Sequence, residues 1–144
     1  MEKLIALGCD HAGFDYKSAV IELLQDKGFT VLDKGTNGTD SVDYPDFVHR
    51  VAQDVSNQKV SLGIVMCGSG NGVAMTVNKY ADIRAALCWN KELAALGRQH
   101  NNANILAIPV RFIDQQTALA MVDTFVTTSF EGGRHQRRVQ KINK

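Results

Sequence analysis

Short apolar runs alternate with amphipathic stretches along the chain, and this alternation constrains the fold more than any other feature. Five of the runs are typical of buried strands, at residues 4–9, 29–32, 62–66, 83–87 and 105–108. Helical spacing of apolar residues fills the segments between them. Strands that alternate with helices pair in parallel through right-handed crossovers. The pattern predicts an α/β fold, a three-layer α/β/α sandwich that is Rossmann-like and has about five parallel strands.

Capping signals mark several of the expected helix boundaries. Lys27-Gly28 would give the first helix a basic last turn followed by a glycine. Pro45 suits the first turn of the second helix, and Asp114 can cap the long helix after the fifth strand. A final basic helix is expected from about His135. Since there is no linker, repeat or low-complexity segment, one domain is expected over residues 1–144.

Composition excludes several classes of function. A net charge of +1 over 144 residues argues against a general nucleic-acid or membrane-surface binder. The three cysteines, Cys9, Cys67 and Cys88, are widely spaced, which argues against a disulfide framework or a zinc ribbon. The first apolar run is too short for a signal peptide, and no run is long enough to span a bilayer. A cytoplasmic protein is therefore expected.

Ligands of such folds bind at the carboxyl ends of the strands, near a topological switch point. Asp10-His11 directly follows the first strand. A carboxylate beside an imidazole there can move protons on oxygen atoms. The alternative is a helix-capping aspartate beside a solvated histidine, and the pair alone does not decide between the two.

The loop from Cys67 to Gly72 is the most informative local feature. Its three glycines, Gly68, Gly70 and Gly72, allow the backbone to approach a ligand closely. Amides at the start of the following helix can hold an anion and favour the thiolate of Cys67. A thiolate beside such donors suits removal of a carbon-bound proton, with the donors stabilising an enediolate. The alternative is a buried, inert cysteine in a tight turn.

The same loop does not match the common phosphate-binding motifs. Val73 occupies the position of the third glycine in a dinucleotide-binding fingerprint. The loop also lacks the lysine of a P-loop and the arginine that a cysteine phosphatase needs. Neither dinucleotide binding nor phosphoryl hydrolysis is therefore expected.

Basic residues near the C-terminus form a second candidate site. Arg134 and Arg138 are four residues apart, so a helix would place them on one face, where two guanidinium groups suit a phosphate dianion. The alternative is a solvated basic tail. His100-Asn101 precedes the fifth strand, and a histidine there can simply be favourable charge at a helix C-terminus.

Taken together, these segments resemble the type B ribose-5-phosphate isomerases, a family that includes allose- and galactose-6-phosphate isomerases. Each segment is weak alone, but they occur in the family's order over nearly the whole chain. The matching segments are Gly8–Gly13, Asp33–Thr36, Asp43–Pro45, Cys67–Gly72, Asn78-Lys79, Arg98–Asn101 and Gly132–Arg138.

The resemblance implies a homodimer whose active sites are built from both subunits, with further pairing into tetramers left open. Cys67 is implied as the base that moves a proton between C1 and C2, because the position of Val73, a glutamate in another branch, cannot ionise here. His100 would help to open the furanose ring, and Asp10 would assist at the ring oxygens. Ser69 would move protons between O1 and O2.

The resemblance also implies a set of substrate-binding residues. Amides of Gly68, Gly70, Asn71 and Gly72 would form the anion hole, and Tyr44 and Asn101 would contact substrate hydroxyls. His11, Arg134 and Arg138 would bind the phosphate. Arg111 would add a phosphate contact from the partner subunit, which would also supply His100 and Asn101.

The expected activity is the interconversion of D-ribose 5-phosphate and D-ribulose 5-phosphate through an enediolate, a step of the pentose phosphate pathway. A base and an anion hole are enough for this chemistry. No cofactor is expected, and no metal, because no His/Asp/Glu cluster has convincing ligand spacing in the sequence. Two alternatives stay open: an allose-6-phosphate isomerase, and a non-catalytic sugar-phosphate binding module.

Overall fold

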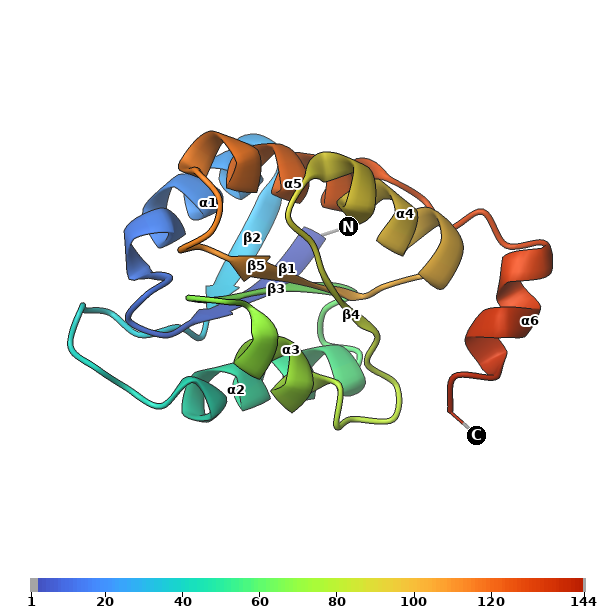
Figure 1. Cartoon of the computed structure of the whole chain (residues 1–144), viewed down its shortest axis with the longest axis horizontal. Helices are drawn as coiled ribbons and strands as arrows, with labels where there is room; N and C mark the ends of the chain where they lie inside the picture. The colour runs from blue at the N-terminus through green and yellow to red at the C-terminus, as the bar shows by residue number, and fades with distance from the viewer. Residues whose placement is uncertain (1–2, 144) are drawn as a thin grey trace.

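A computed structural model describes residues 3–143, and residues 1, 2 and 144 lie outside it. The described residues form one parallel sheet between two layers of helices (Figure 1). The sheet order is β2-β1-β3-β5-β4. The strands are β1 (Lys3–Cys9), β2 (Phe29–Asp33), β3 (Leu62–Cys67), β4 (Ala85–Leu87) and β5 (Ile105–Pro109). The helices are α1 (Phe14–Asp26), α2 (Tyr44–Ser56), α3 (Asn71–Val77), α4 (Lys91–Asn101), α5 (Gln115–Thr127) and α6 (Arg134–Gln140).

The side chains of the central strands alternate between two apolar cores. Leu7 and Ile64 face α1, α4 and α5, where Phe125 is fully buried. Ala6 and Val65 point to the other face, which α2 and α3 cover. Figure 1 shows these helices above and below the sheet. Because both faces are covered, the strands read as continuous apolar runs. The predicted three-layer sandwich with five parallel strands is confirmed.

One edge strand is shorter than the sequence predicted. The apolar run begins at residue 83, whereas β4 begins at Ala85. The amide of Ile83 donates to the carbonyl of Tyr80, and the amide of Arg84 donates to Oδ1 of Asn104. These bonds divert two amides from the ladder, so pairing starts two residues later.

The predicted capping residues flank the expected helices, although Lys27 is the C-cap residue of α1 and lies just outside its last turn. Oδ1 of Asp114 accepts from the Thr117 amide at 2.8 Å and caps α5. Gly28, after α1, has a φ of +91°, which glycine adopts without strain. Pro45 lies in the first turn of α2. The basic helix α6 begins at Arg134, one residue before the prediction, which is within the usual uncertainty of a helix end.

The strand order places a topological switch point between β1 and β3. The chain leaves β1 for β2 on one side, then crosses to β3 on the other. Crevices at the carboxyl ends of such strands are the usual ligand sites. In Figure 1 the strand arrows point to the left, whereas α6 projects from the right of the molecule. No helix within residues 3–143 is long and apolar enough to cross a membrane.

Candidate active site

Cys67 ends β3 at the switch point beside β1. Met66 pairs with Cys9, and the Asp10 amide donates to the Met66 carbonyl, so the first two candidate segments lie side by side. Cys67 is 5% exposed, and its Sγ accepts from the Gly70 amide at 3.2 Å. Donation from an amide stabilises negative charge on sulfur. The cysteine is therefore held in the turn with one donor already directed at it.

The glycine loop is closely covered by its surroundings. A Cβ on Gly72 would lie 2.4 Å from the Tyr44 ring, so Tyr44, the first residue of α2, packs directly on the loop backbone. The Asn71 amide donates to Oγ of Ser69 at 3.2 Å. Two of the amides predicted to form the anion hole, Gly70 and Asn71, thus have partners inside the loop. An anion would compete for them with Cys67 and Ser69.

Asp10 and His11 shape the neighbouring turn. Oδ1 of Asp10 accepts from the amides of Ala12 and Gly13 at 2.9 and 3.3 Å, and Asp10 is 6% exposed. One carboxylate oxygen therefore stabilises the turn into α1. Nδ1 of His11 accepts from the Val42 amide at 3.2 Å. A neutral His11 ring consequently carries its proton on Nε2, as a donor to an anion needs.

Arg111 lies beside the glycine loop of its own chain. Its side chain contacts Gly68 of the same chain, where an added Cβ would lie 3.2 Å from the guanidinium Nη1. Its amide donates to the Gly68 carbonyl at 3.1 Å. The physical reason is that Arg111 follows β5 by two residues and so reaches the same sheet edge as Cys67. This chain therefore supplies an Arg111 beside its own cysteine, and the implied phosphate contact from the partner's Arg111 stays a prediction.

The remaining predicted residues lie at the opposite end of the sheet. α4 runs back from the carboxyl end of β4, so His100 and Asn101 in its last turn precede the start of β5. Cys67 pairs with Pro109 and Gly63 pairs with Ile105, four residues apart along the strand. Four steps of a parallel strand span about 13 Å. Within one chain, His100 and Asn101 are therefore too far from Cys67 to act on the same sugar.

Arg134 and Arg138 share this far end. Both lie on α6, which packs against α4. None of the seven residues of α6 is buried. Figure 1 shows the helix standing away from the layered body. The two arginines are thus presented outward, at the end remote from Cys67.

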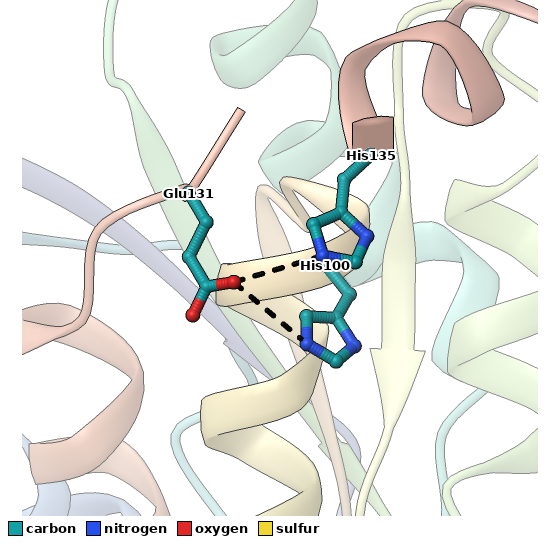
Figure 2. Close-up of side chains that lie close together, drawn as sticks. All are labelled: His100, Glu131 and His135. Atoms are coloured by element: carbon teal, nitrogen blue, oxygen red, sulfur yellow. Dashed lines mark ion pairs between the residues drawn. The ribbon is translucent and has the colours of Figure 1, made fainter. Parts of the chain in front are cut away.

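A cluster that the sequence analysis missed surrounds His100. Its ring stacks on that of His135, with centroids 4.2 Å apart and planes 12° apart. The Glu131 carboxylate faces both rings (Figure 2), with Oε1 3.9 Å from Nε2 of His100 and 3.6 Å from Nε2 of His135. Partial desolvation and the nearby His100 and Arg134 lower the pKa of His135. The four-residue spacing of Glu131 and His135 was visible in the sequence, but it gave no sign of His100.

The other two cysteines are buried away from solvent. Burial raises the pKa of Cys9 and that of Cys88, each to about 11. Both are free thiols, as expected of small buried apolar residues. Neither is a candidate nucleophile or base.

A family model described as Ribose/Galactose Isomerase matches residues 5–142. The chain belongs to the ribose/galactose isomerase family. A relative named ribose-5-phosphate isomerase B from Escherichia coli (strain K12) is 42% identical over 140 residues, which cover 97% of this chain and 94% of the relative. A probable ribose-5-phosphate isomerase B from Mycoplasma genitalium is 45% identical, with 96% and 92% covered.

Solved structures of ribose/galactose isomerases have the same fold. A ribose 5-phosphate isomerase from Thermotoga maritima superposes with a TM-score of 0.95 at 45% identity, covering 99% of both chains. The type B ribose 5-phosphate isomerase of Trypanosoma brucei also gives 0.95, at 34% identity, with 99% and 98% covered. The likeness thus extends over the whole fold, including α6.

Proposed function

We propose that this chain is an aldose–ketose isomerase that interconverts D-ribose 5-phosphate and D-ribulose 5-phosphate. Family membership and the names of full-length relatives support the reaction and its substrate. The observation that carries the proposal is the position of Cys67, in a glycine loop at the switch point between β1 and β3. A sugar-phosphate binding module without turnover would have no use for a cysteine there.

In the proposed mechanism, Cys67 acts as general base. Its thiolate removes the proton from C2 of the open-chain aldose and returns it to C1, so that no net proton is consumed. Amides of the loop bind the enediolate oxygens, for which Gly70 and Asn71 exchange their internal partners. Ser69 passes a proton between O1 and O2. Asp10 stands at the ring oxygens beside the loop.

We infer that the active site is completed by a second copy of the chain. Cys67 and Arg111 lie at one end of the sheet, and His100 and Arg138 lie at the other. A homodimer that sets the carboxyl end of one sheet against the far end of its partner would bring the sets together. The partner then supplies His100 for ring opening and Asn101 for the substrate hydroxyls.

Phosphate binding would also draw on both chains. Nε2 of His11 is available as a donor because Nδ1 accepts from the backbone. Arg111 lies over Gly68 of the same chain. Arg134 and Arg138 of the partner would close on the dianion from the other side, and guanidinium forks suit its oxygens. Tyr44, packed on Gly72, is placed to contact a sugar hydroxyl.

A cytoplasmic setting in the pentose phosphate pathway fits this proposal. All three cysteines are free thiols, which persist in reducing compartments. Cys67 must stay reduced to serve as a base. The same reaction is the expected one for a pathway that handles pentose phosphates.

Replacement of Cys67 tests the base directly. Cys67→Ala should lower kcat by about 10²–10⁴-fold and abolish exchange of the C2 proton with solvent. Cys88→Ala is the matched control, because Cys88 is also buried but lies outside the loop. Both variants should keep the wild-type circular dichroism spectrum. Wild-type turnover by folded Cys67→Ala would show that another group is the base.

Subunit mixing tests the shared site. Cys67→Ala and His100→Asn chains should each form inactive homodimers. After random reassociation in equal amounts, half of the dimers are mixed and each has one intact site, which restores about a quarter of wild-type activity. If every site were contained in one chain, mixing would restore nothing.

A further inference from the structure

We propose that His100, Glu131 and His135 form a binding site for a transition-metal dication such as Zn²⁺. The site is separate from the cysteine loop of the same chain, and sequence spacing alone gave no reason to expect it. The binding claim rests on the geometry of this cluster. Its consequence for catalysis, given below, rests on the proposed role of His100.

The donor set fits this class of metal. Two imidazoles and one carboxylate, with an open fourth position, are a common zinc coordination set. Their ligand atoms all lie within 4.8 Å of one another. Figure 2 shows the Glu131 carboxylate facing both rings from the segment before α6, with His100 on α4 and His135 on α6. Imidazole ligands favour Zn²⁺, Co²⁺, Ni²⁺ and Cu²⁺ over Mg²⁺ and Ca²⁺.

The distances are close to those of a metal site. Bonds of 2.0–2.2 Å in a tetrahedron place neighbouring ligand atoms about 3.3 Å apart. Glu131 Oε1 lies 3.6 Å from His135 Nε2 and 3.9 Å from His100 Nε2. These separations are longer than hydrogen bonds, and the carboxylate is within ion-pair distance of both rings when they are protonated. Because the two rings are stacked nearly parallel, they must rotate before both Nε2 lone pairs can point at one ion. A shift of about 0.3–0.6 Å then brings Oε1 of Glu131 to the tetrahedral spacing.

The backbone holds the three residues in place. The Glu131 amide donates to the Gln99 carbonyl at 3.0 Å, which ties the carboxylate to the turn of α4 that carries His100. The His135 amide donates to the Gly132 carbonyl at 3.0 Å. The His135 side chain is only 12% exposed, whereas those of His100 and Glu131 are 41% and 51% exposed. The cluster thus has one fixed ligand and two that solvent and metal can reach.

A metal at this cluster would inhibit the proposed isomerase. Coordination takes the lone pair of His100 Nε2, and with it the ability of that nitrogen to accept or deliver a proton during ring opening. The nearby Arg134 and Arg138 oppose the metal's positive charge. Because both need Nε2 of His100, the metal and a sugar undergoing ring opening would compete for that nitrogen.

Binding is measured on the whole protein after removal of metals with a chelator. Zn²⁺ titrated by calorimetry should bind at one ion per chain, and Mg²⁺ should not bind. Glu131→Gln and His135→Gln should each weaken Zn²⁺ binding by at least about tenfold, since even the loss of an outer-shell partner costs that much. His49→Gln is the matched control, because His49 lies on α2, bonds Tyr80 and is not one of the three ligands. Its loss should leave Zn²⁺ binding unchanged.

The absorption spectrum of bound Co²⁺ distinguishes binding at this cluster from binding at a cysteine. Co²⁺ bound by nitrogen and oxygen ligands should give visible absorption without the near-ultraviolet charge-transfer band of a thiolate ligand. Circular dichroism checks the fold of each variant. If His135→Gln does not fold, the Zn²⁺ affinity of Glu131→Gln alone tests the site. Absence of Zn²⁺ binding, undiminished binding by Glu131→Gln, or a thiolate band would overturn the proposed site.

An activity assay addresses the consequence separately. Zn²⁺ should inhibit wild-type isomerase, and at least about ten times more Zn²⁺ should be needed for Glu131→Gln. If Zn²⁺ binds at the cluster but activity is unchanged, the role of His100 in ring opening is refuted while the metal site stands.

Discussion

Substitution of Gly70 by alanine tests how tightly the Cys67–Gly72 loop is constrained. Gly70 has a φ of +75°, and a Cβ there would lie 2.5 Å from Leu87 Cδ1 and 3.2 Å from the backbone nitrogen of Pro109. The left-handed conformation costs an alanine about 1–2 kcal/mol. Overpacking a tight site adds about 1–3 kcal/mol. Gly70→Ala should therefore lower the free energy of unfolding by about 2–5 kcal/mol.

Gly28→Ala separates the two contributions. Gly28 also has a positive φ, +91°, but nothing lies within 4 Å of an added Cβ. This variant should lose only the conformational part, about 1–2 kcal/mol. Urea unfolding followed by far-ultraviolet circular dichroism would show the difference as a midpoint gap on the order of 1 M. Equal midpoints for the two variants would refute the steric argument.

The same pair has a catalytic readout. The Gly70 amide donates to Cys67 Sγ, so displacement of the loop should lower kcat/KM by about 10²-fold, the usual cost of losing an anion-hole donor. Gly28 follows α1, away from the loop, and Gly28→Ala should keep wild-type kcat/KM. Retained activity in folded Gly70→Ala would show that this amide does not serve the reaction.

Three further predictions concern the thiols and the helix caps. At pH 8, iodoacetamide should label Cys67 alone in the native protein, because burial raises the pKa of Cys9 and Cys88 to about 11. Ribose 5-phosphate should block this labelling. Mass spectrometry that counts the labelled sites checks both results. Asn90→Ala should cost about 1 kcal/mol in urea unfolding, since Asn90 caps α4, and an unchanged midpoint would contradict it. The cap hydrogen bond holds the pKa of Asp114 below its usual 3.8, so its stabilising effect is complete above that value and is lost as pH falls through the lowered pKa. Acid titration of Asp114→Asn should therefore show a shallower loss of stability than wild type, and parallel curves would disprove the assignment.

The strands were predictable because each is a local apolar run. A parallel strand buried on both faces needs nothing beyond its own segment to be recognised. The predicted start of β4 was wrong because the observed start depends on Asn104, whose side chain accepts from the Arg84 amide and so removes that amide from the sheet. No periodicity within residues 83–87 encodes that contact. Strand order is likewise a property of tertiary packing.

The candidate site was predictable where residues follow strand ends. Asp10 and Cys67 share an edge because parallel strands all end on the same side. The same rule places Arg111 of the same chain beside them. The cluster of His100 with Glu131 and His135 follows no such rule, because α5 separates its members in the chain.

The isolation of α6 has a consequence for the dissociated protein. A helix of seven residues is too short to persist by its own hydrogen bonds, and apart from the His135 side chain, which stacks on His100, it packs little on α4. Arg134 and Arg138, which would bind the phosphate, thus lie on a helix that its own chain stabilises only weakly. Dilution below the dissociation constant of the dimer should therefore unfold α6 while the sheet and its covering helices stay folded. Activity would then be lost although the circular dichroism spectrum is still that of a folded protein.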